Sequence, residues 1–457
     1  KIAKIIPMFK GGESAKVCNY RPISLLCNFS KMLEFIIYKQ IYFQIQSRLS
    51  PVQHGFTAGR STSTNLVCMS QNIAETLDNK SQLDVIYTDL VKAFDKVDHQ
   101  TLINKLANIG LCNSLLNFLI SYLSSRKNYV FNNGYKSNCY IALSGIPQGS
   151  TLGPLLFSLY VNDVVTVFKH SQVLMFADDI KIFRKIVGFP DSLLLQEDVN
   201  NFFNWCRDNY FSININKCKI VTYSLCKTPV IFNYTISGNA ISRCSTVKDL
   251  GVLFDNQFSF NFHIEYLVSK CIKMSGFILR NCKSFSDIQA LVTLFFALVR
   301  SNVQYCCVAW FPYYNKQIVL LESVQRKFLK HLYYKDVGTW PKRGYSYTFL
   351  LQKFNFDTLN NGRILAVLTF LYKLLNNHID CSSLLSKLNF HVPRVNCRYA
   401  VTLYCPRPRT NIGRRAPVYL FCHYLNMVES SSDSWDIYCS SLSELRSHVR
   451  RRFQVCM

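Results

Sequence analysis

The 457-residue sequence predicts an α+β fold: a mixed N-terminal half, a helical region after about residue 255, and a basic C-terminal extension. Strand-like and helix-like segments alternate over residues 81–187. Long amphipathic segments then replace that alternation. Between residues 381 and 428 there is no acidic residue, whereas there are seven Lys or Arg. Together these observations indicate two or three domains around a sizeable core.

The mixed half contains several elements whose ends can be placed. Apolar periodicity predicts a helix over residues 29–49, which ends before Pro51. The segment LDVIYTDL, residues 83–90, is rich in β-branched and aromatic residues and predicts a strand. HQTLINKLANIG predicts a helix closed by Gly110. The remaining elements are two strands around an Asn-Asn-Gly turn over 127–143, a helix over 192–209, and strands over 217–224 and 230–236.

The helical region is predicted to contain long helices over residues 263–280, 287–303, 320–334 and 363–377. The most apolar stretch, residues 288–299, is too short for the roughly 20 residues that span a bilayer, so it predicts a buried helix. The chain opens on KIAKIIPMFKGG, without an apolar signal-peptide core and without Met. We therefore expect a fragment of a longer product that acts inside the cell, in the cytoplasm or nucleus, and is not secreted.

The charge balance indicates a polyanionic partner. Lys and Arg number 52 against 27 Asp and Glu, which gives a net charge of +25. Nucleic acid fits this charge better than an acidic membrane surface, and no membrane partner is predicted. A merely solvated basic tail is the alternative for residues 381–428. The 19 cysteines include no C-x-x-C pair and no zinc-finger spacing with His, which predicts reduced thiols.

Paired carboxylates mark the candidate site. In VLMFADDIKIF, residues 173–183, apolar flanks predict a hairpin that presents Asp178 and Asp179. Two adjacent carboxylates repel each other unless a cation neutralises them, and Mg²⁺ prefers such oxygen ligands. Asp89, at the end of a buried strand, could complete a three-carboxylate cluster for two metal ions. The alternatives are a solvated acidic tip for the pair and a helix N-cap for Asp89.

A third segment, SGIPQGSTLGPLLFSLYVNDV, leads from a Pro-Gln-Gly turn into an apolar helix. Gly149 lets the backbone pass close to a ligand, and Gln148 offers both a hydrogen-bond donor and an acceptor. Taken alone, this segment could be any loop–helix junction.

The order of these segments resembles motifs A, B and C in the palm of reverse transcriptases, and the Phe-Ala-Asp-Asp box resembles the non-LTR (LINE-type) form. Four further motifs support the resemblance. The first fingers motif is resembled by residues 7–34, through Pro7, Lys10, Asn19–Ser24, Lys31 and Glu34. The next fingers motif is resembled by HGFTAGRST. SININKCK resembles motif D, and VKDLGVLFD resembles the primer-grip motif E. The later helical and basic parts resemble those of jockey-type insect elements. The chain is therefore similar to a truncated, jockey-like non-LTR retrotransposon enzyme.

The resemblance implies a right-hand polymerase. Fingers would span residues 1–80, and a palm with an antiparallel sheet 81–255, returning to the fingers near 110–140. A helical thumb would span 256–335, and a basic region of uncertain role 336–457. The implied activity is RNA-directed DNA synthesis with an RNA template, a DNA primer, dNTPs and two Mg²⁺ ions, with Mn²⁺ as a substitute. A catalytically inactive nucleic-acid-binding relic and a telomerase relative are the alternatives.

By resemblance, the metal ligands are Asp89, Asp178, Asp179 and the backbone carbonyl of Leu90. Lys217, at the motif D position, would be the general acid for the leaving pyrophosphate.

The resemblance also assigns the nucleotide site. Lys10 and Arg21 would neutralise the triphosphate. Phe94 falls where the family has a bulky ring that excludes the 2′-OH, and core packing is its alternative. Gln148 and Gly149 would contact the nucleotide and the template.

The remaining assignments concern nucleic acid and structure. Thr57 stands where the family usually has Arg, which makes Arg60 the nearest substitute, and Cys218 replaces the usual Thr of motif D. Asp95 and His99 are interpreted as fixing a helix start. The residues expected to contact nucleic acid are Arg60, Gly251, Arg407, Arg409, Arg414 and Arg415.

Overall fold

The computed structural model describes residues 1–392, 402–429 and 436–453, and the chain divides into two compact units. Unit 1 comprises Lys1–Ser61, Asp84–Ile220 and Val230–Arg243. Unit 2 comprises Thr62–Leu83, Val221–Pro229 and Cys244–Met457. Each unit is therefore assembled from separate stretches of sequence.

The first sheet of unit 1 has the strand order β2-β1-β4-β5, with β6 also paired to β4. β1 pairs antiparallel with β2 and parallel with β4. Between β4 and β5, Asn133 and Gly134 both have positive φ (48° and 87°), as a type I′ hairpin turn requires. The predicted hairpin is confirmed, although its second arm is split into two short strands. The strands are β1 (Ile2–Phe9), β2 (Tyr20–Leu25), β4 (Lys127–Asn132), β5 (Tyr135–Lys136) and β6 (Tyr140–Ile141).

The second sheet has the order β12-β9-β3-β8-β7. β7 and β8 form an antiparallel hairpin, as predicted, whereas β9 and β12 run parallel. The prediction of a wholly antiparallel sheet is therefore wrong at this edge. The strands are β3 (Gln82–Thr88), β7 (Gln172–Phe176), β8 (Asp179–Ile186), β9 (Lys219–Tyr223) and β12 (Ser242–Arg243).

The predicted strand over residues 230–236 is also mostly wrong. Only β10 (Thr235–Ile236) forms, paired with β11 (Asn239–Ala240). The Phe232 carbonyl accepts a hydrogen bond from the Arg243 guanidinium at 2.5 Å. A side chain thus satisfies a backbone group that a strand would have placed in a ladder.

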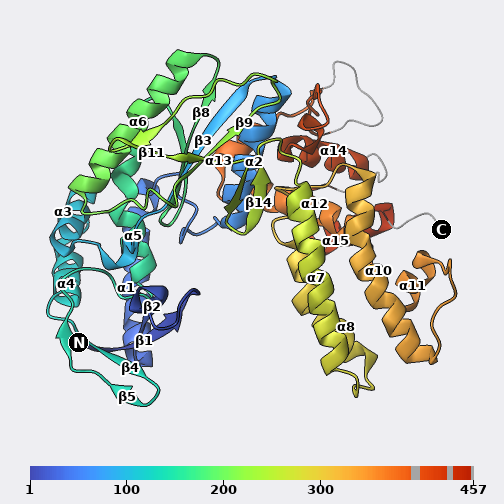
Figure 1. Cartoon of the computed structure of the whole chain (residues 1–457), viewed down its shortest axis with the longest axis horizontal. Helices are drawn as coiled ribbons and strands as arrows, with labels where there is room; N and C mark the ends of the chain where they lie inside the picture. Colours follow the sequence, from blue (N-terminus) through green and yellow to red (C-terminus); the bar gives the residue numbers. More distant parts are fainter. Residues whose placement is uncertain (393–401, 430–435, 454–457) are drawn as a thin grey trace. The chain divides into compact units, whose positions relative to one another are not determined.

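The helices of unit 1 contribute to one core with β3, β7 and β8, although α1 does so mainly through Ile41 and Ile45. α6 lies against β8 (Figure 1). α3 begins after Asp98, whose carboxylate accepts from Thr101 N at 2.8 Å, so Asp98 rather than Asp95 caps this helix. Gly110 ends α3 with φ 86°, as predicted. The helices are α1 (Asn28–Ile45), α3 (His99–Ile109), α4 (Asn113–Leu123), α5 (Gly153–Tyr160) and α6 (Phe189–Asp208).

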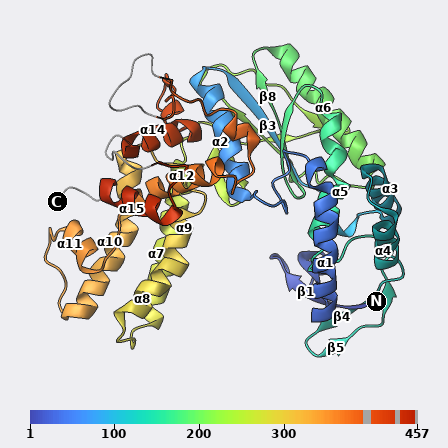
Figure 2. The same ribbon diagram turned by 180° about the vertical axis from the view of Figure 1, so that it is seen from behind.

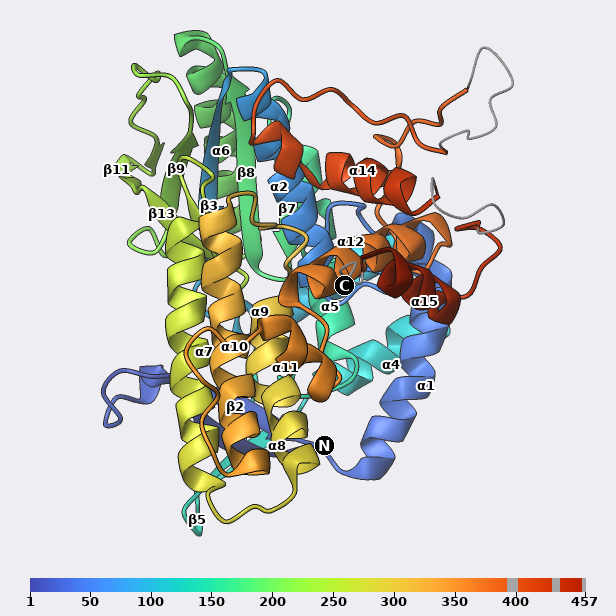
Figure 3. The same cartoon turned by 90° about the vertical axis from the view of Figure 1, so that its right-hand side faces the viewer.

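Unit 2 is mainly helical. The helices α7 and α10 pack side by side (Figure 3), and α12, α14 and α15 pack together (Figure 2). A π-helical turn at Phe296–Arg300 joins α8 to α9 within the predicted helix over 287–303. The unit contains α2 (Thr62–Asp78), β13 (Thr246–Asp249), β14 (Val252–Asp255), α7 (Asn261–Asn281), α8 (Ile288–Phe295), α9 (Ser301–Gln304), α10 (Asn315–Val337), α11 (Tyr347–Lys353), α12 (Leu359–Leu375), α13 (Ser382–Leu385), α14 (Pro417–Glu429) and α15 (Leu442–Phe453).

Two expectations about environment can be compared with the structure. In the part of the chain that the structure describes, no helix is both long and apolar enough to cross a membrane. Cys218 and Cys307 are buried free cysteines.

The buried histidine of α7 gives unit 2 a pH-dependent stability. His263 is 1% exposed, accepts a hydrogen bond from Leu253 N through Nδ1 at 3.2 Å and packs on Trp310. Burial lowers the pKa of His263 to about 4. The unfolded chain therefore binds the proton first as the pH falls below about 6.5. The free energy of unfolding should drop by up to about 3 kcal/mol between pH 6.5 and 4.

Denaturant unfolding across this pH range tests that expectation. His263→Gln keeps an acceptor but removes the titrating ring, so its unfolding free energy should depend less on pH than that of the wild type. The control is His391→Gln, because His391 is exposed. Equal pH dependence in wild type and His263→Gln would contradict the assignment.

Candidate active site

The first carboxylate lies directly after β3. The backbone carbonyl of Asp89 accepts from Asn214 N, and Val91 N donates to Ser212 O, both at 2.8 Å. This short ladder brings the segment before β9 alongside Asp89. It places Lys217 Nζ 3.6 Å from Asp89 Oδ2. The predicted motif A aspartate and motif D lysine are therefore adjacent in the structure.

The other two carboxylates lie at the tip of the β7–β8 hairpin. Phe176 pairs with Asp179, so Ala177 and Asp178 form a two-residue turn. Ala177 has a φ of 55°, the left-handed conformation that such a tight turn requires. The Asp178 side chain is half-buried, whereas Asp179 is exposed.

Three other charged side chains act on the pKa of Asp178. Burial raises the pKa of the Asp178 carboxyl, and the negative charge of Asp89 raises it further. The positive charges of Arg21 and Lys10 lower that pKa. Lys10 and Arg21 come from the β1–β2 hairpin, where Lys10 N donates to Asn19 O at 2.8 Å. Asp89, Lys10 and Arg21 therefore lie within electrostatic range of Asp178.

The carboxylates are near one another but do not form a closed metal cage. Within residues 1–392, 402–429 and 436–453, no group of three or more His, Cys, Asp or Glu side chains is arranged to hold a metal ion. The three-carboxylate cluster therefore stays a prediction. The donor chemistry nevertheless fits a hard cation, because mutual repulsion between Asp89 and Asp178 would fall on neutralisation.

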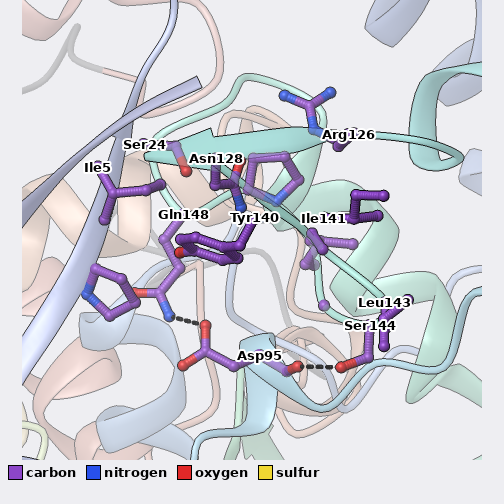
Figure 4. Close-up of a pocket in the computed structure, with 15 residues that line it drawn as sticks. Ile5, Ser24, Asp95, Arg126, Asn128, Tyr140, Ile141, Leu143, Ser144 and Gln148 are labelled. Carbon is purple, nitrogen blue, oxygen red and sulfur yellow. Dashed lines mark hydrogen bonds between the residues drawn. The ribbon is translucent and has the colours of Figure 1, made fainter. Parts of the chain in front are cut away.

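The Pro-Gln-Gly turn packs against the end of β2. Ser24 N donates to Gln148 O at 2.7 Å. Gly149 has φ 106°, and a Cβ there would lie 2.8 Å from Ser24 O, so a side chain does not fit. Gln148 Nε2 donates to Asp95 Oδ1 at 2.7 Å (Figure 4). Asp95, interpreted from sequence as fixing a helix, instead orients Gln148.

A cavity of about 390 Å³ adjoins Gln148. Its wall includes Asp95, Ser24 and Tyr140, whose side chains Figure 4 shows around the Gln148 amide. His99 Nε2 lies 2.8 Å from Gly145 O, which holds the loop that forms another part of this wall. Hydrogen-bonding groups and apolar side chains thus line one concave surface around Gln148.

Phe94 is half-buried and packed on its aromatic neighbours. Its ring stacks on Phe157 with centroids 4.3 Å apart, and Phe56 meets it edge-on at 6.1 Å. Phe94 O accepts from Ile146 N, which ties the residue to the strand-like segment before Gln148. The packing alternative for Phe94 therefore holds, and it is compatible with a role in sugar selection.

Two residues predicted to contact nucleic acid have structural partners. Arg60 Nη1 donates to Ser50 O at 2.7 Å and to Gln53 O at 3.0 Å. In unit 2, Gly251 and Leu250 form the two-residue β13–β14 turn, both with positive φ. A Cβ on Gly251 would meet the Tyr305 ring at 3.3 Å.

The four C-terminal arginines differ in exposure. Arg407, Arg409 and Arg414 are exposed, whereas Arg415 is buried and donates to Ser259 O at 3.3 Å. Their loop is fixed by Asp78 at the end of α2. The Asp78 carboxylate accepts from Thr410 N and Oγ1, both at 2.7 Å, and from Arg409 N at 3.1 Å. The basic segment is therefore an ordered loop rather than a loose tail over these residues.

One buried carboxylate has a role that the sequence did not reveal. Glu34 is 3% exposed, and its oxygens accept from Tyr122 OH and Thr151 N, both at 2.7 Å. It thus holds the backbone between Gly149 and α5. Glu34 belongs to a fingers motif of the resemblance, but no local pattern indicates a partner more than 100 residues away.

Comparison with known proteins agrees with this geometry. The family described as reverse transcriptase (RNA-dependent DNA polymerase) matches residues 10–278. The RNA-directed DNA polymerase from mobile element jockey of Drosophila funebris is 32% identical over 280 residues, covering 58% of this chain and 30% of that protein. The probable RNA-directed DNA polymerase from transposon X-element of Drosophila melanogaster is 28% identical over 328 residues, covering 69% and 36%.

Among solved structures, apo telomerase from Candida tropicalis has a TM-score of 0.43 and 11% identity, covering 78% of this chain and 61% of that one. The present chain spans about a third of the two curated relatives. The family match nevertheless covers more than half of the chain's 457 residues. The chain therefore belongs to the reverse transcriptase family and is a jockey-like member of its non-LTR retrotransposon branch.

Proposed function

We propose that this chain is an RNA-directed DNA polymerase that transfers dNTPs onto a primer 3′-OH along an RNA template. The observation that carries the proposal is the charge pattern around Asp178. A half-buried carboxylate beside Asp89, facing Arg21 and Lys10, suits a substrate with a metal-neutralised triphosphate. The proposal includes action inside the cell, in the cytoplasm or nucleus.

Reverse transcriptases use divalent metal ions, and the residues that would hold two Mg²⁺ here are Asp89, Asp178, Asp179 and the Leu90 carbonyl. When bound, such ions stabilise negative charge on the transferred phosphoryl group. Mn²⁺ has the same preference for oxygen ligands and would be a substitute.

The chain's own residues would do the remaining work. Lys10 and Arg21 would bind the triphosphate and hold it in line. Phe94 would lie against the sugar, and the Gln148 amide, oriented by Asp95, would contact the nucleotide beside Gly149. Lys217, now 3.6 Å from Asp89, would donate a proton to the leaving pyrophosphate.

The proposed domains follow the family pattern. Residues 1–80 would act as fingers and 81–255 as the palm, with a return to the fingers near 110–140. Residues 256–335 would form the thumb, with Gly251 before it at the primer. Arg60 is included among the predicted nucleic-acid contacts, although it also holds residues 50–53.

A second candidate function is binding of nucleic acid without catalysis. The net charge of +25 and the exposed side chains of Arg407, Arg409 and Arg414 favour it. Primer extension by the purified chain decides between the two. The assay uses an RNA template with RNA and DNA primers, dNTPs, and either Mg²⁺ or Mn²⁺. Extension supports the polymerase; salt-dependent binding without extension under any of these conditions supports the binding protein.

The exposed arginines of the Asp78-held loop should contribute to nucleic-acid affinity. Replacing Arg407, Arg409 and Arg414 together by Gln should weaken binding to a primed template. The slope of log K against log salt should also become shallower by about 2 to 3, because each phosphate contact contributes about 0.7 to 0.9. Fluorescence anisotropy at several salt concentrations measures both quantities.

The control for that variant removes the same charge elsewhere. Lys185, Arg207 and Lys227 are exposed, and none of them is among the predicted nucleic-acid contacts. Their combined replacement by Gln should leave the slope close to that of the wild type. Equal slopes for the two triple variants would show that only total charge matters and would contradict a binding role for the loop. Arg415 is excluded from the test because its burial would confound folding with binding.

A further inference from the structure

The tip of the β7–β8 hairpin is held in a conformation that its sequence does not favour. Ala177, immediately before Asp178, has φ 55°, and a non-glycine residue in the left-handed region costs about 1 kcal/mol or more. Such a residue stays there only if its surroundings fix it. The orientation of the peptide that enters Asp178 therefore depends on groups outside the hairpin.

The side chain of Gln53 supplies those groups. It is 2% exposed and lies against the backbone of Ala177. Its Oε1 accepts from Ala177 N at 3.0 Å and from Gly55 N at 2.8 Å. Its Nε2 lies 3.4 Å from Ala177 O and donates to it. One amide thus holds both polar backbone groups of the strained residue.

The backbone around Gln53 is attached to the same hairpin. Met175 N donates to Val52 O at 2.9 Å, and His54 N donates to Met175 O at 2.8 Å. These bonds pair the segment around Gln53 with β7, through a parallel bridge between Gln53 and Met175. The amide of Gln53 therefore cannot drift away from the tip without breaking this ladder.

Two further residues leave this arrangement little freedom. A Cβ at Gly55 would lie 2.4 Å from Ala177 N, closer than any side chain can approach. Arg60 fixes the other side of the segment through its bonds to Ser50 O and Gln53 O. The guanidinium thus secures the backbone that carries the Gln53 amide.

We infer that Gln53 is a positioning residue, which locks Ala177 in its left-handed conformation and thereby sets where the Asp178 carboxylate lies. Gly55 and Arg60 support it, one by close packing and one by hydrogen bonds. The inference rests on the proposed polymerase function, because the position of Asp178 affects the reaction only if Asp178 takes part. The competing explanation is that Gln53 merely satisfies buried backbone groups and contributes to stability alone.

The test compares two glutamines with similar bonds. Gln53→Met keeps the volume but removes the acceptor and the donor. Gln196→Met is the matched control, because Gln196 also bonds both backbone groups of one residue, Thr235 N and O, each at 2.8 Å. Gln53→Glu keeps the two hydrogen bonds accepted at Oε1 but replaces the Nε2 donor to Ala177 O by an oxygen, so it tests the donor separately.

The expected result separates position from stability. Gln53→Met should lower kcat about 100-fold, as a displacement near 1 Å can do, while KM for the dNTP changes less than about threefold. Its Mn²⁺ affinity, measured by electron paramagnetic resonance, should fall about 10-fold. Amide exchange at residues 176–180 should quicken. Gln196→Met should keep wild-type kcat and Mn²⁺ affinity, and Gln53→Glu should give a kcat between those of the wild type and Gln53→Met.

Several outcomes would overturn the inference. One is equal kcat and equal exchange at residues 176–180 in Gln53→Met and wild type. Another is unfolding of Gln53→Met under conditions in which Gln196→Met stays folded, since Gln53 would then act through stability. Gly55→Ala provides a second approach, because it displaces the tip while leaving the Gln53 amide intact, and it too should lower kcat. If the wild-type chain extends no primer, the proposed function fails, whereas exchange and Mn²⁺ binding still decide the role of Gln53.

Discussion

Replacing Asp178 by Asn is expected to reduce dNTP incorporation on a primed RNA template by about 1,000-fold or more, equivalent to about 4 kcal/mol of transition-state stabilisation. Asn keeps the size of the side chain and removes only the charge. That charge is the part of Asp178 that would bind a divalent cation. Single-turnover incorporation at saturating dNTP measures the loss without interference from product release.

The same change should not destabilise the fold. Burial and the charge of Asp89 both raise the pKa of Asp178, so the ionised carboxylate is unfavourable where it lies. The thermal midpoint of Asp178→Asn should therefore equal or exceed that of the wild type, as is common when a functional charge is removed. Asp163→Asn is the control, because it also removes one carboxylate charge but lies outside the proposed site. Asp163 is half-exposed and pairs with Lys105 at 2.7 Å, so this variant should keep wild-type dNTP incorporation. Wild-type incorporation by Asp178→Asn would eliminate the proposed site.

Replacing Phe94 by Val is expected to relax the choice between deoxyribonucleotides and ribonucleotides by about 10- to 200-fold, the range that one steric contact can supply. The ring stacks on Phe157 at 4.3 Å and cannot turn aside without losing that contact. It therefore offers a fixed surface to the sugar. The ratio of kcat/KM for a dNTP and the matching rNTP measures the change.

Loss of the ring should also cost stability, by about 2–4 kcal/mol. Phe211→Leu separates the two effects, because Phe211 is buried and lies 6.3 Å from the same Phe157 ring. It should destabilise the chain without changing the sugar ratio. If both variants change the ratio equally, selection depends on core rigidity rather than on the Phe94 surface.

The elements that the sequence predicted best have local causes. The β7–β8 hairpin, the strand before Asp89 and the helix ended by Gly110 follow from side-chain periodicity and turn chemistry over a few residues. The close approach at Gly149 follows from one glycine in a turn. Each depends on neighbours in sequence, so each could be predicted without the structure.

The features that sequence did not predict depend on distant partners. Asp95 bonds Gln148, Glu34 bonds Thr151, and Gln53 bonds Ala177, across 53, 117 and 124 residues. A side chain whose hydrogen-bond partner lies so far away in the sequence produces no periodic pattern. The residue that caps the N-terminus of α3 was predicted wrongly for a local reason. Asp95 and Asp98 both precede this helix, and only the geometry shows that Asp98 caps it.

The attachment of Asp78 to Thr410 has a consequence for synthesis of the protein. These partners are 332 residues apart, and α2, which Asp78 ends, is largely buried. At about 5–20 residues per second, a ribosome needs roughly 20 to 60 seconds to make that intervening chain. During that time the apolar surface of α2 is not yet covered by the C-terminal part of the chain. Nascent chains should therefore bind a chaperone at α2, and chains released before residue 410 should aggregate.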